Sequence, residues 1–235
     1  MNILTEHDTL RYIIKHKCSI ARYGDGEFKL CLGRSAKSQK VNPLIKNDLR
    51  KILLSNNRKC LVGIPRITSR VDWSSEQKKE FWYKFIAVKK SLCREDKLYG
   101  SSFITRPDAA PEIYNKDYFW LLKQIWKDKD VIVVKGEYQK FNRNTSMFST
   151  ANKVHLVCEA RNDAYKDKDS IINFVKGEVT KNSVVVISLG PTATVIAYEL
   201  SKLGIQALDL GHLGQYYARV HPKGMDYAGE DFEYS

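Results

Sequence analysis

Short apolar runs alternate along the chain with longer stretches in which apolar residues recur every three or four positions. Nearly continuous apolar runs are typical of strands covered on both faces, and the longer stretches are typical of helices packed on a sheet. The runs predict strands at residues 19–23, 60–65, 98–104, 131–136, 154–160, 183–190 and 205–211. The pattern therefore predicts an α/β fold with a mostly parallel sheet and helices on both faces.

Helix signals lie between these runs. One amphipathic stretch starts at Thr5 and a second follows Asn42. A third spans residues 74–93, and Pro111 suits the first turn of a fourth. Residues 184–210 read as strand, helix and strand, which predicts a right-handed crossover between parallel strands.

The chain has 235 residues, of which 43% are hydrophobic and 28% charged, so it can bury one sizeable core. We expect a single domain over residues 1–222 and an acidic tail over residues 223–235. No run approaches the roughly 20 apolar residues of a membrane-spanning helix, and the acidic start does not resemble a signal peptide. The five cysteines are widely spread without a Cys-x-x-Cys pair, so we expect them to be reduced and structural. The sequence thus predicts a cytoplasmic protein.

The formal net charge of +12 is unevenly distributed. The segment from Lys29 to Arg70, which we call the basic lobe, holds eleven Lys or Arg residues and a single acidic residue, Asp48. Basic surfaces attract nucleic acids, anionic membranes and small polyphosphates, and charge by itself does not rank these partners. A solvated lysine-rich face without a specific partner is an equal alternative.

The first polar cluster, Arg22 to Glu27, comes at the end of a predicted strand. Gly24 and Gly26 flank Asp25 and allow backbone to approach a ligand closely. Asp25 and Glu27 offer hard oxygen ligands that could share one Mg²⁺ or Mn²⁺ with a bound diphosphate. The alternative is a tight turn in which Glu27 favours the start of the next helix.

The second cluster lies between a predicted strand and the helix that begins near Gly190 and Pro191. A helix N-terminus favours phosphate, and the hydroxyls of Thr192 and Thr194 would add donors. The other glycines of a dinucleotide fingerprint and the lysine of a Walker loop are missing, which disfavours nicotinamide and ATP-hydrolysing enzymes. Asp209, at the end of the following strand, stands where a ribose-binding acid would lie. The alternative is a proline-started helix that its threonines cap.

The third cluster is Gly211 and His212, directly after the last predicted strand. His212 is a candidate base, although a lone histidine is more often structural. Glu137 and Arg106 follow two other strands, and Arg106 could hold a phosphate with its planar fork or be an ordinary surface arginine. Because ligands of α/β sheets bind at the carboxyl ends of strands, we expect these turns to converge on one site.

Four ordered segments, from about Ser19 to His212, resemble the bacterial glycosyltransferases of the GT-D fold. They are ARYGDGEF, GSSFITRP, IWKDKDVIVVKGE followed by MFSTANKVHLVCEA, and SLGPTATVIAYELSKLGIQALDLGH. That family was first catalogued as a domain of unknown function and includes enzymes that extend glycans on streptococcal serine-rich adhesins. The resemblance covers most of the chain and implies a Rossmann-like α/β enzyme.

The resemblance also implies transfer of a hexose from a UDP-sugar to a glycan acceptor, with Mn²⁺ or Mg²⁺ held by a D-x-E motif, here Asp25-Gly26-Glu27. The ion and nearby cations would stabilise the departing UDP, and a base would accept the proton of the acceptor hydroxyl. The residues expected at the nucleotide-sugar site are Arg22, Gly24, Gly26, Arg106, Gly190, Pro191, Thr192, Thr194 and Asp209.

Two departures from the family pattern bear on specificity and on the base. After Glu137, relatives often continue with a Gly-rich, Asn-Asp-containing stretch where this chain has YQKFNRN, so donor or acceptor preference could differ. After His212, relatives tend to carry acidic residues where this chain has LGQYYAR. The catalytic base therefore stays open between His212, Glu137 and Asp209.

We therefore expect a metal-dependent glycosyltransferase that acts on a capsule or exopolysaccharide repeat or on a glycoprotein glycan, with a lipid-linked or protein-linked acceptor. The alternatives are a basic nucleic-acid-binding α/β protein and another Rossmann-type nucleotide enzyme. Nucleic acid is the least favoured partner, because the chain lacks the sequence motifs of nucleic-acid-binding folds. The basic lobe is expected to contact an anionic membrane on its cytoplasmic face, where lipid-linked acceptors lie.

Overall fold

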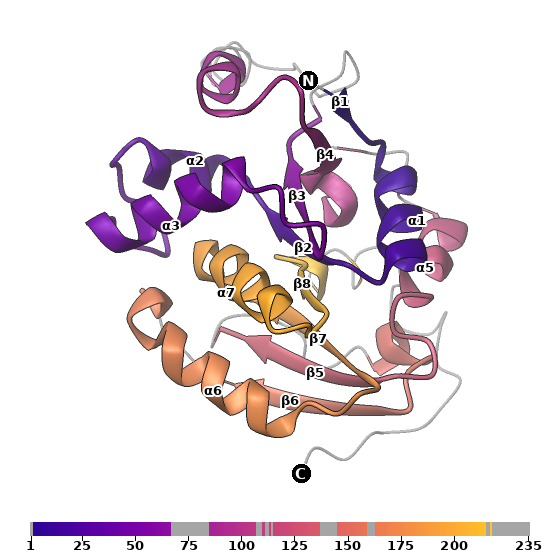
Figure 1. The fold of residues 1–235 in the computed structure, drawn as a ribbon. Helices are drawn as coiled ribbons and strands as arrows, with labels where there is room; N and C mark the ends of the chain where they lie inside the picture. Colours follow the sequence, from indigo (N-terminus) through magenta and orange to yellow (C-terminus); the bar gives the residue numbers. More distant parts are fainter. Residues whose placement is uncertain are drawn as a thin grey trace.

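The computed structural model describes residues 2–66, 85–106, 110, 113, 115–136, 145–158, 163–214 and 217. Within these residues, eight strands form one sheet in the order β1-β4-β3-β2-β8-β7-β5-β6 (Figure 1). The strands are β1 (Asn2–Ile3), β2 (Ser19–Arg22), β3 (Cys60–Ile64), β4 (Leu98–Ser101), β5 (Asp130–Lys135), β6 (Lys153–Cys158), β7 (Ser183–Ser188) and β8 (Ala207–Asp209). All of the pairings between them are parallel. The predicted Rossmann-like α/β fold is confirmed.

Helices cover both faces of the sheet (Figure 1). One face carries α1 (Glu6–His16) and α5 (Lys116–Lys123), and the other carries α3 (Pro43–Leu54), α6 (Lys168–Glu178) and α7 (Pro191–Lys202). The short helix α2 (Asp25–Cys31) packs on α3. Alternate strand positions face the two layers: in β5, Val133 belongs to the buried cluster that includes residues of α1 and α5, and Ile132 to the cluster of α6 and α7. Burial on both faces explains the nearly continuous apolar runs.

Side-chain caps begin three of these helices. Thr5, Asn42 and Asn115 accept hydrogen bonds of 3.0, 3.0 and 2.8 Å from the backbone N–H groups of Asp8, Ile45 and Tyr118. Each cap satisfies an N–H group that has no partner inside the helix. The helix starts predicted at Thr5 and after Asn42 are therefore confirmed.

One predicted boundary is wrong. The strand predicted over residues 98–104 ends at Ser101 and continues as a 3₁₀ turn, η1 (Ser102–Thr105), because the Ser101 hydroxyl accepts from the Phe103 N–H at 3.1 Å. Pro111, expected in the first turn of a helix, lies outside the described residues, and α5 begins at Lys116, where Asn115 supplies the cap.

Several elements were missed or are described in part. The sequence pattern did not predict β1 or α6, and it gave a helix start at Glu27, here α2, only as the alternative to a metal site. Of the helix predicted over residues 74–93, the structure describes residues 85–92 as helical. The predicted acidic tail, residues 223–235, lies outside the described residues.

Two further findings concern the membrane and the cysteines. None of the helices in the described part of the chain is long and apolar enough to cross a membrane. The described cysteines are buried free thiols, as expected: Cys18, Cys31, Cys60 and Cys93.

The chain order creates a topological switch point between β2 and β8. From β2 the chain runs through α2 and α3 to β3 on one side, whereas β8 is reached from β7 through α7 on the other side. In parallel α/β sheets a crevice opens at such a point, outside the carboxyl ends of the strands. The residues that follow β2 and β8 therefore meet at one place.

Replacing Asn42 by Ala should lower the free energy of unfolding by about 1 kcal/mol, because the Ile45 N–H at the start of α3 loses its acceptor. Equilibrium unfolding in urea measures the change. Asn47→Ala is the matched control, since Asn47 is exposed within the same helix and alanine favours helix interiors. Equal losses in the two variants would contradict the capping role.

Candidate functional site

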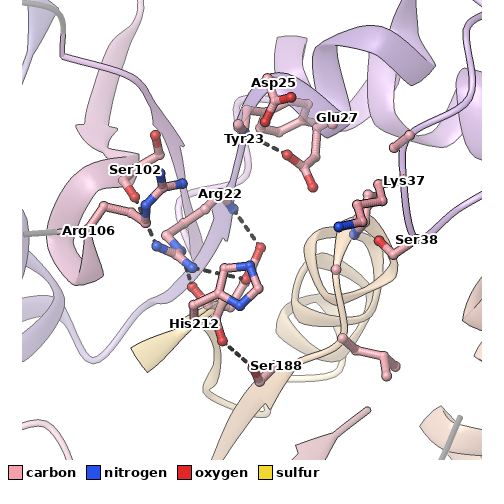
Figure 2. Close-up of a pocket in the computed structure, with 18 of the residues that line it drawn as sticks. Arg22, Tyr23, Asp25, Glu27, Lys37, Ser38, Ser102, Arg106, Ser188 and His212 are labelled. Carbon is pink, nitrogen blue, oxygen red and sulfur yellow. Dashed lines mark hydrogen bonds and ion pairs between the residues drawn. The ribbon is translucent and has the colours of Figure 1, made fainter. Parts of the chain in front are cut away.

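A cavity of about 680 Å³ opens at the carboxyl edge of the sheet, at the switch point (Figure 2). Its walls come from the turns after β2, β4, β5, β7 and β8, from the first turns of α2 and α7, and from the loop between α2 and α3. The polar and charged lining residues are Arg22, Tyr23, Asp25, Glu27, Lys29, Lys37, Ser38, Ser102, Arg106, Ser188, Asp209 and His212. The strand-end turns therefore converge, as predicted.

Arg22 joins the ends of three strands (Figure 2). Its Nη1 donates to the Ser102 carbonyl at 2.9 Å and to the Thr105 hydroxyl at 2.6 Å, both just beyond β4. Its Nε donates to the Asp209 carbonyl at the end of β8. The Arg22 side chain is 8% exposed, and most of its N–H donors bond within the protein. Arg22 therefore orients the cavity wall, and few of its N–H groups are available to a ligand.

Asp209 completes this buried cluster. Its carboxylate lies 3.5 Å from Nη2 of Arg22 and accepts from the Arg22 N–H at 3.3 Å and the Thr194 hydroxyl at 3.0 Å. Burial raises the pKa of Asp209, and the Arg22 guanidinium opposes that rise. Asp209 was predicted to bind a ribose. It lines the cavity, but both of its oxygens also bond within the protein.

Gly211 makes room for the Arg22 side chain. Its φ is +52°, and a Cβ at this position would overlap Nη2 of Arg22. The Ser188 hydroxyl donates to the Gly211 carbonyl, which ties the end of β7 to the same turn. A glycine is therefore required at this position for both backbone and packing reasons.

Asp25 and Glu27 lie in the first turn of α2 (Figure 2). Glu27 Oε2 accepts from the Gly24 N–H at 2.6 Å, which is the half of a capping box that a glycine N-cap allows, and Asp25 pairs with Lys29 at 2.8 Å. The alternative prediction, in which Glu27 favours a helix start, is confirmed. Both carboxylates still line the cavity, so the capping role and a ligand role are compatible.

The surroundings of Glu27 disfavour the charged form of its carboxyl group. Burial, with the Asp209 carboxylate nearby, raises the pKa of Glu27 to about 7, while the Gly24 N–H opposes the rise. A cation that enters the cavity would therefore stabilise the charged form of Glu27.

This arrangement fits a hard divalent cation whose coordination is completed by a ligand. Within the described residues, no group of three or more His, Cys, Asp or Glu side chains could hold a metal ion. Two carboxylates with phosphate oxygens and water suit Mg²⁺ or Mn²⁺, which seldom bind in all-protein cages. The two carboxylates on one cavity wall favour a cation here, and the raised pKa of Glu27 is consistent with it.

Gly190 and Pro191 line the cavity at the start of α7, where they were predicted. Thr192 and Thr194, predicted to donate to the ligand, are fully buried. The Thr192 hydroxyl donates to Oε1 of Gln39 at 3.0 Å, and that of Thr194 lies 2.8 Å from the Arg22 carbonyl. The prediction is corrected: these side chains lie on the inner face of the first turn, so their hydroxyls bond behind the cavity wall.

Of the other predicted site residues, four line the cavity and one lies outside the described residues. Gly24, Gly26, Arg106 and His212 line the cavity. Arg106 is half-buried and His212 is exposed. Glu137 lies outside the described residues.

Sequence reasoning missed Lys37 and Ser38, which line the cavity from the loop between α2 and α3 (Figure 2). Neither residue follows a strand, and the prediction considered residues at the ends of strands. The excess of lysines in the basic lobe was the one available signal.

The fold and the site define a Rossmann-like α/β protein with its ligand cavity at the switch point of a parallel sheet. The chain belongs to the glycosyltransferase GT-D fold family, whose model matches residues 20–223. The resemblance noted from the four sequence segments is thereby confirmed.

Individual relatives agree with this assignment. The chain is 30% identical over 225 residues to the "Probable glycosyl transferase Gly" of Streptococcus gordonii, covering 92% of this chain and 33% of that protein. It is 30% identical over 220 residues to the "Glycosyltransferase GlyD" of Streptococcus pneumoniae, covering 89% of this chain and 26% of that protein. The chain thus spans a third or less of the length of these curated relatives.

A solved structure agrees as well. "A New Glycosyltransferase (DUF1792) from Streptococcus sanguinis" superposes with a TM-score of 0.80 at 30% identity, covering 92% of this chain and 83% of that chain.

Gly211→Ala should destabilise the protein more than Gly204→Ala. Both glycines have positive φ, but a Cβ at Gly204 meets nothing within 4 Å, whereas one at Gly211 displaces Arg22. The loss at Gly204 should be about 1 kcal/mol, from backbone conformation alone. Urea unfolding of the two variants measures the difference, and equal losses would show that Arg22 is not held as described.

Glu27→Gln should stabilise the metal-free protein at pH 8 but not at pH 5. The pKa of Glu27 is about 7 in the folded protein against an ordinary value of 4.5. Between these values the folded protein holds a proton that the unfolded chain has released, so the stability contributed by Glu27 falls as the pH rises. The glutamine variant lacks this loss.

The measurement is the thermal midpoint in chelator-containing buffer at both pH values. Asp25→Asn is the control, since Asp25 is exposed and faces Lys29. A midpoint difference for Glu27→Gln that is equal at pH 5 and pH 8 would contradict the raised pKa.

Proposed function

We propose that the protein is a metal-dependent glycosyltransferase that transfers a hexose from a UDP-sugar to a bacterial surface glycan. The observation that carries this proposal is the placement of Asp25 and Glu27 in one cavity with Lys37 and the start of α7 (Figure 2). The carboxylates suit a divalent cation, and the ammonium and the helix N-terminus suit the diphosphate that such a cation would bind.

The residues of the cavity supply what displacement at an anomeric carbon requires. When bound, the cation neutralises part of the charge on the departing diphosphate. Lys37 and Arg106 add positive charge beside it, and the N-terminal turn of α7 orients phosphate oxygens. Arg22 and Asp209 hold the walls in place, so these groups need little reorganisation as charge develops.

His212 is the proposed base. It lines the cavity and is exposed, and an imidazole is well suited to exchange a proton near neutral pH. Asp209 is a weaker candidate because its carboxylate is paired with Arg22. Glu137 remains a candidate that lies outside the described residues.

The proposed acceptor is a capsule or exopolysaccharide repeat or a glycoprotein glycan, linked to lipid or protein. The names of the curated relatives support glycosyl transfer and leave the acceptor open. Exposed cations of the basic lobe that lie outside the cavity lining support peripheral contact with an anionic membrane at the cytoplasmic face; they are Arg34, Lys40, Arg50 and Lys51.

UDP with Mn²⁺ should raise the thermal midpoint by about 5 °C or more at roughly 100 times its Kd, because binding to the folded state adds stability. The double variant Asp25→Ala with Glu27→Ala should lose the Mn²⁺-dependent part of that rise. Incubation with a panel of UDP-sugars and Mn²⁺ should release UDP by slow hydrolysis from at least one donor.

Glu178→Ala is the control, because Glu178 is an exposed acid at the end of α6 and does not line the cavity. An unchanged midpoint with UDP and Mn²⁺, together with no UDP release from any donor, would overturn the proposal. Salt-sensitive binding to DNA or RNA in the same preparation would then favour the nucleic-acid alternative.

A further inference from the structure

The loop between α2 and α3 brings a tight turn, Ala36 to Gln39, to the edge of the cavity. The Ala36 N–H donates to the Gln39 carbonyl at 2.9 Å, and the Gln39 N–H donates back to the Ala36 carbonyl at 3.4 Å. Ala36, Lys37 and Ser38 all line the cavity. Two reciprocal backbone bonds thus give this segment a defined shape without a helix or a strand.

Gln39 anchors the turn to two other parts of the fold. Its side chain is 2% exposed. Oε1 accepts from the Thr192 hydroxyl at 3.0 Å and from the Tyr165 N–H at 3.2 Å, while Nε2 donates to the Lys40 carbonyl at 3.1 Å and to the Asp163 carboxylate. Each hydrogen-bonding position of this buried amide has a partner.

Asp163 completes the anchor from the opposite side. Its carboxylate accepts from the Lys40 N–H at 3.0 Å, and its own N–H donates to the Ser38 carbonyl at 2.9 Å. Asp163 holds the left-handed conformation that these bonds require, with φ at +69°. The turn is therefore fixed to the first turn of α7 through Thr192. It is also fixed to η4 (Ala164–Asp167) through Asp163, which is the N-cap residue of η4, and through Tyr165 within it.

This anchoring controls where Lys37 lies. Figure 2 shows its ammonium pointing into the cavity. Within the described residues, no hydrogen bond or ion pair engages that ammonium, whereas Lys29 on the same wall is paired with Asp25. The neighbouring Ser38 hydroxyl packs on Gly190, since a Cβ added there would lie 2.8 Å from it. An exposed lysine that has no partner among the described residues thus faces the cavity beside the start of α7.

We propose that Lys37 binds the diphosphate of the donor and that Gln39 is the positioning residue that holds Lys37 in place to do so. The inference rests on the proposed function, because it assumes a nucleoside diphosphate in the cavity. The physical reason is entropic: a lysine on a flexible stem gains little from one anion unless the backbone that carries it is fixed. The buried amide of Gln39 fixes that backbone.

The first test compares the affinities of UDP and uridine, by calorimetry and by ligand-observed NMR. Lys37→Met should weaken UDP binding about tenfold or more and leave uridine binding unchanged, because the lost contact involves only phosphate. Lys37→Arg should retain most of the UDP affinity. Lys51→Met, which removes an exposed lysine of α3 outside the cavity lining, should bind UDP as the wild type does.

The second test asks whether Gln39 acts through Lys37. Gln39→Met should produce the same selective loss of UDP affinity. In a Lys37→Met background it should add little, since the group that it positions is gone. In the donor hydrolysis reaction, both single variants should raise KM for the UDP-sugar. Asp163→Gly is the second variant should Gln39→Met fail to fold, because glycine accepts the positive φ of Asp163 while removing the acceptor of Nε2.

The outcomes separate this inference from the proposed function. A wild type that binds UDP and hydrolyses a donor, with Lys37→Met binding UDP equally well, would overturn the inference and leave the proposed function intact. Equal loss of UDP and uridine binding in Gln39→Met would show a merely structural role. A wild type that binds no UDP removes the proposed function. Inorganic diphosphate then becomes the probe. Weaker binding of diphosphate to Lys37→Met than to the wild type would support an anion site at Lys37, and equal binding would overturn it.

Discussion

The buried contact between Arg22 and Asp209 is the interaction on which the rest of the site depends. It crosses the switch point from β2 to β8, and the same guanidinium reaches the backbone and a hydroxyl beyond β4. Two charges are buried together only when hydrogen bonds compensate most of their lost hydration. Thr194, Thr105 and the strand-end carbonyls of Ser102 and Asp209 provide those bonds, and Gly211 provides the space.

Around the Arg22–Asp209 cluster, the cavity holds positively and negatively charged side chains close to one another, and within the described residues not all of them are paired. Glu27 stands near the Asp209 carboxylate, which together with burial raises the pKa of Glu27. Lys37 points into the same space from a turn that Gln39 and Asp163 anchor. The charged form of Glu27 is stabilised when a cation enters, and Lys37 is already placed to meet an anionic ligand, so the site needs little reorganisation to bind both.

Much of the fold could be predicted from the sequence because its strands are buried on both faces and its helices carry regular apolar stripes. The failures were local. The chain turns after Ser101 because one hydroxyl accepts from the Phe103 N–H, and the short helix α2 was hidden by a motif that also suits a metal-binding turn. At the site, strand-end reasoning identified Arg22, Asp25, Glu27, Asp209 and His212 as wall residues. It misjudged Thr192 and Thr194, since a helix start does not show which of its side chains face inward.

The α/β class, the mostly parallel sheet, the family and the strand ends at which the cavity opens could all be predicted from the sequence. These features depend on hydrophobic periodicity and on short contiguous motifs, both of which can be read along the chain. Which polar groups face the cavity and which bond behind it depends on the assembled sheet and its helices. Arg22 bonds to Ser102, 80 residues away, and to Asp209, 187 residues away, and Gln39 bonds to Asp163, 124 residues away. Such partners meet only when the sheet forms, because no local pattern specifies which distant strand ends will be neighbours.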